Sequence, residues 1–340
     1  MKPLVSILIA AYNAEEWIGY TLHSAVDQTW PRTEIIVVDD GSTDRTAEVA
    51  RQFGVTVVST KNRGLSAAQN YAFSLSHGDY IQYLDADDLL APDKIERQLA
   101  ALRETDSRRV LLSSPWAPFY YRTRRARFIH NSLWRDLSPV DWLIQKMSEG
   151  IHMQNATWLV SRELALAAGP WDESLNYDQD GEFFCRVLLA SEGTRFVPET
   201  GIYYRTSGTR SISYIGTSNT KRESLFRSMM LHVQYLRSLE ESERVRKACL
   251  TYLQIWYHTF YPGHMELVTK LQAIAAQLGG RLRPHRLRWK YAWMEPVLGR
   301  RTATWAQMAF PHLKAFMLRK WDKAMFWLEA GDTTFTDPIG

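Results

Sequence analysis

The sequence is poor in cysteine and contains no long apolar run. Its two cysteines, Cys185 and Cys249, form neither a CxxC pair nor a disulfide framework, which suits a reducing cytoplasm. No apolar run approaches the roughly 18 residues of a membrane-spanning helix. Residues 4–11 are apolar but too few for a signal peptide, and Asn13 and Glu15 follow at once. These absences predict a cytoplasmic protein without a transmembrane span.

The sequence also lacks the glycine-rich loops that hold phosphate groups in many nucleotide-binding folds. The first apolar run ends in Ala10-Ala11-Tyr12-Asn13, with neither GxGxxG nor GxxxxGK[ST]. This argues against a dinucleotide-binding or P-loop fold. The net charge of +4 is too small to indicate nucleic acid binding on its own, so no nucleic acid partner is expected.

Short apolar runs alternate with helical patterns through the first ninety residues. Continuous apolar strands are typical of a parallel sheet that is buried on both faces. Regular alternation with short connections predicts an α/β fold with a mostly parallel sheet flanked by helices. The expected strands are residues 5–11, 34–39, 55–59 and 80–84, with a further strand at 110–112. The expected helices are residues 14–27, with Asn13 as the cap, a segment ending near 53–54, and a segment from 62–64 to 76.

An acidic cluster follows the fourth expected strand. Asp85, Asp87 and Asp88 come directly after residues 80–84. The carboxyl ends of parallel strands face the ligand crevice, so these carboxylates are placed to meet a substrate. Carboxylate and water oxygens favour Mg²⁺ or Mn²⁺, completed by substrate phosphates. The alternative is an acidic turn before a helix that starts at Pro92.

Four segments in order carry a family resemblance. They read VSILIAAYN at residues 5–13, VVDDGSTD at 37–44, NRG at 62–64 and YLDADD at 83–88. Together they resemble the nucleotide-sugar domain of family 2 glycosyltransferases, which has the GT-A fold. Each motif is weak alone, but the four in this order are highly specific.

The resemblance implies a nucleoside site at the ends of the first two strands. Ala10, Ala11 and Tyr12 would line the nucleoside pocket, and Asp40 would hydrogen-bond the base, most often uracil. Residues 39–43 are also residue types that often cap a helix. Asp40 could contact a base and belong to a helix cap at the same time, so the two interpretations are compatible.

The resemblance also implies a metal site. Asp85 and Asp87 match the DxD motif, with Asp87 as the direct metal ligand and Asp85 at the ribose or a metal-bound water. Two positions depart from common family forms. Gln69 stands where an arginine that contacts the diphosphate or nucleoside is often found, and Ser207 stands where a histidine is often found. Water, Ser207, Arg205 or Arg210 would then complete the contacts to metal or diphosphate.

A second acidic segment matches the family's candidate base. Asp180 corresponds to the aspartate of the Glu-Asp pair that precedes a helix, and Gln179 replaces the glutamate. The implied role of Asp180 is general base toward the acceptor hydroxyl, and a partly desolvated site would raise its pKa. Asp178 and Glu182 are rivals in sequence, and an acidic helix start stabilised by the helix dipole is the structural alternative.

The second half of the chain reads as helix. A length of 340 residues exceeds a usual single core, so we expect a catalytic domain at residues 1–215 and a helical region at 216–340. Basic residues interleave with Trp and Phe there, as on surfaces that lie on anionic lipid. A helical cap on the catalytic domain or a homodimer contact fits the same pattern. The arginines of residues 122–127 are expected in a solvated loop, with an anionic acceptor as the alternative.

The leading hypothesis is a metal-dependent glycosyltransferase of the hexosyltransferase type. It would move a sugar from a nucleotide diphosphate sugar, with a UDP-sugar favoured, to a hydroxyl acceptor in polysaccharide or glycolipid assembly. The family resemblance implies inversion. The protein would be cytoplasmic, with peripheral contact at the inner membrane face as one option. The alternatives are a non-catalytic sugar-nucleotide binding module and a nucleotidyltransferase.

Overall fold

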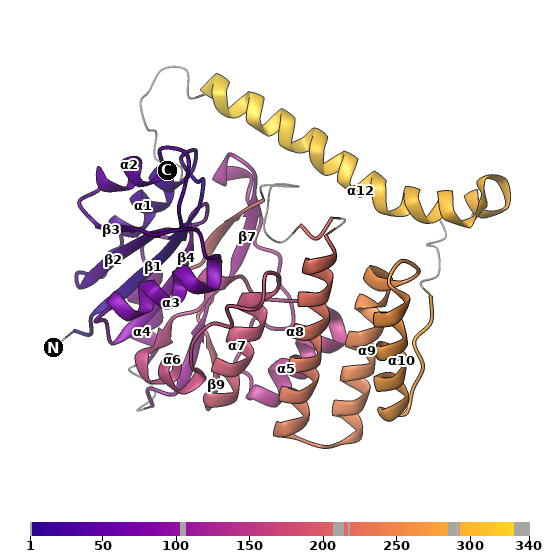
Figure 1. Ribbon diagram of the computed structural model, residues 1–340. Coiled ribbons are helices and arrows are strands. Elements are labelled where there is room, and N and C mark those ends of the chain that lie inside the picture. The colour runs from indigo at the N-terminus through magenta and orange to yellow at the C-terminus, as the bar shows by residue number, and fades with distance from the viewer. Residues whose placement is uncertain are drawn as a thin grey trace.

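The chain is built around a five-stranded sheet with the order β3-β2-β1-β4-β8 (Figure 1). The structure is a computed structural model that describes residues 2–102, 107–206, 214–216, 218–284, 291 and 293–329. Strands β1 to β4 are parallel, and β8 runs antiparallel to β4. The strands span Val5–Ala11 (β1), Thr33–Asp39 (β2), Thr56–Ser59 (β3), Tyr80–Asp85 (β4) and Val160–Ser161 (β8). The predicted α/β class with a mostly parallel sheet is confirmed.

Alternate residues of the central strands enter two different cores, which explains why these strands are apolar throughout. Leu8 of β1 faces a core shared with α3 (Leu65–Leu75) and the later helices. Its neighbours Ile7 and Ile9 face a core shared with α1 (Ile18–Val26), α2 (Thr46–Arg51) and α4 (Lys94–Ala101). A one-residue slip of β1 would exchange the two cores, so burial fixes the strand register.

Two small sheets extend the fold beside the main one. Strand β10 pairs antiparallel with β5 and parallel with β7, and β6 pairs parallel with β9. Strand β6 was expected from the apolar residues at 110–112. These strands span Leu89–Leu90 (β5), Val110–Ser113 (β6), Trp116–Phe119 (β7), Gly193–Phe196 (β9) and Ile202–Arg205 (β10).

The first helix starts later than expected, and Asn13 does not cap it. Helix α1 begins at Ile18, with Trp17 preceding it. Asn13 has a φ of +49°, and its side-chain oxygen accepts a hydrogen bond from the amide of Thr43 at 2.8 Å. The asparagine therefore ties the end of β1 to the turn after β2. The helix expected to start at Pro92 also begins later, at Lys94.

The later helices share the core of the sheet. Helices α8, α9 and α10 lie side by side next to α5 and α7 in Figure 1, and their apolar residues belong to the core that includes Leu8 of β1. The expected change to helical structure near residue 216 matches the start of α8 at Asn219. The helices are Pro139–Glu149 (α5), Arg162–Ala168 (α6), Gln179–Ala190 (α7), Asn219–Leu239 (α8), Glu243–Phe260 (α9), Met265–Gln277 (α10) and Met294–Glu329 (α12).

Helix α12 runs across one end of the molecule and docks on the segment after β7 (Figure 1). Its Asp322 accepts a hydrogen bond from Arg122 Nε at 2.7 Å, and both side chains are almost fully buried. The prediction that Arg122 lies in a solvated loop is therefore wrong. The partner comes from 200 residues further along the chain, so local composition could not reveal it.

Candidate active site at the carboxyl edge of the sheet

The strand register brings the predicted nucleoside and acidic residues to one edge. Ala11 of β1 pairs with Asp39 at the end of β2, and Ala10 pairs with Asp85 at the end of β4. The amide of Asp40 continues this edge by donating to the carbonyl of Ala11 at 2.8 Å. Because β1 lies between β2 and β4, Ala10 and Ala11 form the floor between the two acidic strand ends.

Asp40 organises the loop at residues 62–64. Its Oδ1 accepts from the amide of Arg63 and its Oδ2 from the amide of Gly64, both at 2.8 Å. The side chain is 4% exposed. Gly41 has a φ of +74°, and a Cβ there would lie 2.7 Å from the amide nitrogen of Asn62, so only glycine fits this turn. The base-reading role of Asp40 stays a prediction, and the carboxylate carries a structural role beside it.

Tyr12 and Gln69 differ in their exposure to solvent. Tyr12 is half exposed beyond the end of β1, where a ring can meet a planar base. Gln69 lies on α3 and is fully buried, and within the described residues neither of its amide atoms has a hydrogen-bond partner. An unpaired buried amide is costly, by about 1–3 kcal/mol. Gln69 must therefore gain access before it can contact a nucleotide.

Asp85 and Asp87 are two carboxylates held in a desolvated setting. Burial and the neighbouring Asp87 raise the pKa of Asp85 to about 6, while Asn155 Nδ2 donates to Asp85 Oδ1 at 3.0 Å. Burial also raises the pKa of Asp87, and Arg205 opposes this. The pair therefore repel one another at neutral pH unless a cation or protons reduce their charge.

The third acid of the cluster serves the fold. Asp88 is fully buried, and its Oδ1 accepts from the main-chain amide of Arg205 at 2.8 Å. Burial and the charges of Asp87 and Asp85 raise its pKa well above the ordinary value. Asp88 is thus held by β10, whereas Asp85 and Asp87 retain partial solvent access.

Asp180 lies in the first turn of α7, and its charge is coupled to the acidic strand end. Burial raises the pKa of Asp180 to about 7, with Asp178 and Asp85 adding to the effect and Lys146 of α5 opposing it. The contribution of Asp85 places the two segments, which are 95 positions apart in sequence, in one electrostatic site. A carboxyl group with this pKa is half ionised near neutral pH, as proton transfer requires.

Asp178 supports the start of α7 instead of competing with Asp180. It has a φ of +60°, and its Oδ2 accepts a hydrogen bond from Ser228 of α8. Buried His232 lies 3.9 Å from the same oxygen and is hydrogen-bonded to the hydroxyl of Tyr252 at 2.9 Å. A Cβ on Gly181 would lie 2.1 Å from Asp178 Oδ1, so glycine is required for this arrangement.

Glu182, the other sequence rival, is engaged by protein partners. Its two oxygens accept from Arg186 Nε at 2.7 Å and from a terminal nitrogen of Arg186 at 2.8 Å. The hydroxyl of Tyr235 donates to the same side chain at 2.7 Å. A buried carboxylate with an arginine fork and a tyrosine hydroxyl is a structural ion pair.

The acidic donor set fits a hard divalent cation. Asp85 and Asp87 offer oxygen ligands, and a cation between them would remove the repulsion that raises the pKa of Asp85. Mg²⁺ is usually bound by one or two carboxylates together with waters and substrate phosphates. Within the described ranges, no group of three His, Cys, Asp or Glu side chains is arranged to hold a metal. Substrate and water would therefore supply the remaining ligands, and Ser207 and Arg210 lie outside the described residues.

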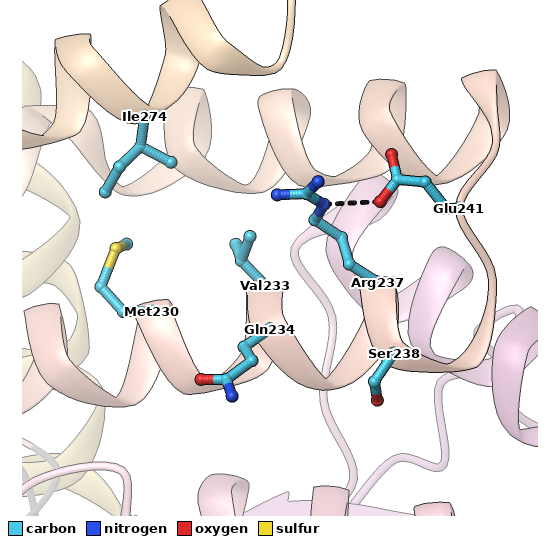
Figure 2. A pocket seen from close by; sticks show the side chains of 7 residues that line it. All are labelled: Met230, Val233, Gln234, Arg237, Ser238, Glu241 and Ile274. Atoms are coloured by element: carbon cyan, nitrogen blue, oxygen red, sulfur yellow. Dashed lines mark hydrogen bonds and ion pairs between the residues drawn. The ribbon is translucent and has the colours of Figure 1, made fainter.

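A shallow depression of about 470 Å³ lies elsewhere, between α8 and α10. Figure 2 shows Met230, Val233 and Ile274 on its apolar side and the Arg237–Glu241 ion pair at one end. None of the predicted site residues lines it. We place the candidate site at the sheet edge, where strand ends and paired carboxylates converge, because the lining of this depression is a surface ion pair, two neutral polar side chains and apolar side chains.

Sequence reasoning missed three contributors to the site. Asn155 holds Asp85, Lys146 adds positive charge near Asp180, and Ser228 holds Asp178. Each comes from a segment far from the residue that it serves. No motif around these positions signals such a role, because the contacts exist only after α5, α8 and the 3₁₀ turn at Asn155–Thr157 have packed.

Comparison with known sequences identifies the acidic edge as part of a known domain. Residues 6–152 match the sequence model of "Glycosyl transferase family 2". Over these residues the chain is similar to that family. The matched segment of the chain includes Asp40, Asp85 and Asp87 but ends before Asp180.

Curated relatives match part of the length of the chain. An uncharacterized glycosyltransferase of Rickettsia typhi is 30% identical over 192 residues, which are 56% of this chain and 60% of that protein. A putative teichuronic acid biosynthesis glycosyltransferase of Bacillus subtilis, TuaG, is 39% identical over 109 residues, which are 30% of this chain and 43% of that protein. The chain thus spans less than two thirds of the length of either relative.

Solved structures share the fold across most of the chain. S. aureus TarS 1–349 in complex with UDP-GlcNAc has a TM-score of 0.65 at 17% identity, covering 81% of each chain. The mannosyltransferase PcManGT from Pyrobaculum calidifontis, in complex with GDP-Man and Mn²⁺, has a TM-score of 0.54 at 20% identity, covering 95% of this chain and 88% of that one. The GT-A assignment of the fold is confirmed.

Proposed function

We propose that this chain transfers a sugar from a nucleotide diphosphate sugar, with a UDP-sugar favoured, to a hydroxyl acceptor with inversion at the anomeric carbon. The proposal rests chiefly on one observation: Asp180 of α7 is electrostatically coupled to Asp85 at the end of β4. A donor diphosphate held at Asp85 and Asp87 would therefore lie within the same site as a carboxyl group poised near neutral pH.

The residues at the ends of β1, β2 and β4 would bind the nucleotide sugar donor. Ala10, Ala11 and Tyr12 would receive the nucleoside, and Asp40 would contact the base while it holds the loop at residues 62–64. The bound nucleotide sugars named for TarS and PcManGT support this class of donor. Asp85 and Asp87 would hold Mg²⁺ or Mn²⁺, which when bound supplies positive charge to stabilise the departing diphosphate.

The acceptor end relies on Asp180. Its ionised carboxylate would accept the proton of the acceptor hydroxyl while that oxygen forms a bond to the anomeric carbon. The bond from the anomeric carbon to the diphosphate oxygen breaks, and the diphosphate leaves with the electron pair. Attack opposite the leaving group inverts the anomeric centre. Asn155 would keep Asp85 oriented, since it already donates to Oδ1.

The biosynthetic setting we propose is polysaccharide or glycolipid assembly. The named role of the TuaG relative in teichuronic acid biosynthesis supports this setting. The sugar itself depends on loop contacts around the donor, so the first experiment is a screen of nucleotide sugars by thermal shift with Mn²⁺ present. A specific donor raises the unfolding midpoint by mass action.

Product analysis tests the reaction class. Incubation with the selected donor and candidate acceptors should release nucleoside diphosphate. Asp180→Asn should lower turnover by about 100-fold or more and leave donor binding intact, because a general base contributes about 10²–10⁴. Asp27→Asn, an exposed carboxylate on the surface, is the matched control.

Four outcomes would contradict parts of this proposal. Unchanged turnover of Asp180→Asn would remove Asp180 as the base, and full activity in excess chelator would remove the metal role. Release of pyrophosphate would indicate nucleotidyl transfer. Donor binding without turnover across an acceptor panel would indicate a non-catalytic sugar-nucleotide binding module.

A further inference from the structure

Helix α12 presents two chemically different sides. The side turned toward the protein carries Asp322 and Phe326, with Glu329 one turn further on. Asp322 is hydrogen-bonded to Arg122, and Glu329 accepts from a terminal nitrogen of Arg122 at 2.7 Å. Phe326 lies with its ring centre 5.8 Å from that of Tyr121. Spacings of four and three residues place these contacts on one stripe of the helix.

The opposite side of α12 is an exposed apolar stripe. Residues 310, 313, 317, 321, 324 and 328 follow one another at intervals of three or four, which is the helical period of a single face. Leu313 is 52% exposed, Met317 58% and Leu328 75%. At 1.5 Å per residue this stripe is about 27 Å long. Figure 1 shows the helix running along the outside of the molecule.

The charges of α12 are divided between the same two sides. Both acidic side chains described on this helix, Asp322 and Glu329, are turned to arginines of the protein. Lys314 and Lys320 are exposed and lie about 60° to either side of the apolar stripe, at 100° per residue. The outward side therefore combines apolar and cationic side chains, and its described part has no acidic partner for the lysines.

This combination fits an anionic lipid surface better than a second copy of the chain. Two copies joined through this stripe would bring four lysines together without an acid on either stripe. A bilayer surface with anionic headgroups offers both an apolar layer and the opposite charge. Among the described helices none is long and apolar enough to cross a membrane, so contact would be in the plane of the surface.

We propose that α12 binds an anionic membrane surface in the plane of the headgroups, with Leu313, Met317 and Leu328 inserted and Lys314 and Lys320 on the headgroups. Trp321 lies at the border of the stripe, where the guanidinium carbons of Arg122 and Arg125 each lie 5.1 Å from its ring centre, and the residue is half exposed. The binding does not depend on the proposed sugar transfer, and it can be measured without any donor or acceptor.

Vesicle flotation of the full chain tests the proposal. The chain should float with vesicles of phosphatidylcholine and phosphatidylglycerol, and bind pure phosphatidylcholine vesicles far less. Binding should weaken as salt is raised, because the lysine contribution is screened. The triple variant Leu313→Ser, Met317→Ser, Leu328→Ser should bind the mixed vesicles about tenfold more weakly or worse, since each change removes buried apolar surface.

Two further variants separate the causes. Lys314→Glu with Lys320→Glu should lose the preference for anionic vesicles. The matched control, Val26→Ser with Leu166→Ser and Met265→Ser, removes exposed apolar side chains from α1, α6 and α10 and should bind like the parent chain. Circular dichroism and the unfolding midpoint establish that each variant is folded.

Three results would overturn the proposal. The parent chain could fail to float with either vesicle, or the α12 triple variant could bind as well as the control variant. Light scattering could instead show a concentration-dependent dimer that the triple variant abolishes while vesicle binding is absent. That last result would assign the stripe to a second copy of this chain.

Discussion

The main-chain amide of Arg205 donates to Asp88 Oδ1 at 2.8 Å, which fastens β10 to the acidic turn after β4. The Arg205 guanidinium adds a second bond, from Nε to the carbonyl of Asp87 at 2.8 Å. It lies between the rings of Trp17 and Phe119, at 3.9 and 4.4 Å from their centres. The acidic turn is thus shaped by an arginine that neutralises part of its charge.

Asp87 and Asp88 of this turn should respond differently to amide substitution. Asp88→Asn should change the free energy of unfolding by less than about 1 kcal/mol, because the amide oxygen still accepts from Arg205 and burial already favours a neutral group. Asp87→Asn should lower sugar transfer by at least about 100-fold while the fold is kept. Urea unfolding and turnover of both variants provide the comparison, and a more damaging Asp88→Asn would refute the division of roles.

Removing the arginine should destabilise the whole edge. Arg205→Met deletes the donors to Asp87 and to the carbonyl of Tyr120, and it leaves buried carboxylates without a countercharge. We expect a loss of about 3–5 kcal/mol in the free energy of unfolding. Arg97→Met breaks an exposed, solvent-screened pair with Asp93 and should change the free energy of unfolding far less than Arg205→Met does. Equal losses of unfolding free energy for the two variants in urea titrations would show that Arg205 does not stabilise the sheet edge more than an exposed arginine does.

Stability should fall as pH rises through neutrality in the absence of divalent ions. The folded chain raises the pKa of Asp85 to about 6 and of Asp180 to about 7, above the ordinary value of 3.8. The folded state therefore binds more protons than the unfolded state between about pH 4 and 7, and this stabilisation is lost as pH rises through the folded pKa values.

Urea unfolding at pH 5 and pH 8 measures this effect. Asp180→Asn should reduce the stability difference between the two pH values by about 2–4 kcal/mol, because the variant cannot ionise there. Asp27→Asn should leave the difference unchanged. A parent-sized difference in Asp180→Asn would mean that the carboxyl group of Asp180 titrates normally in the folded chain.

Gln69 offers a test in which stability and binding move in opposite directions. Gln69→Met replaces a buried amide, for which the described residues provide no partner, by an apolar side chain of similar length. We expect the ligand-free chain to unfold at a higher temperature and the donor nucleotide to bind more weakly. Gln52→Met at an exposed position should change neither. A higher midpoint with unchanged nucleotide affinity would remove Gln69 from the donor site.

The sequence predicted the sheet edge well because its signals are local. Continuous apolar strands follow from burial on both faces, and the acids that end β2 and β4 follow them directly in the chain. The misassigned residues depend on distant partners. Asn13 binds the turn at Thr43 instead of capping α1, and Arg122 is buried only because Asp322 covers it. Local patterning carries no information about such pairs.

The support of Asp178 by Ser228 and His232 has a consequence for how this protein can be recombined. Both partners lie on α8, outside residues 6–152, which carry the family match. A chimaera that replaced only residues 6–152 with those of a relative would exchange the donor motifs and keep Asp178, Ser228 and His232 of this chain together. Exchanging α7 and α8 together would transfer Asp178 with both of its partners. These two helices are therefore expected to change together among related chains.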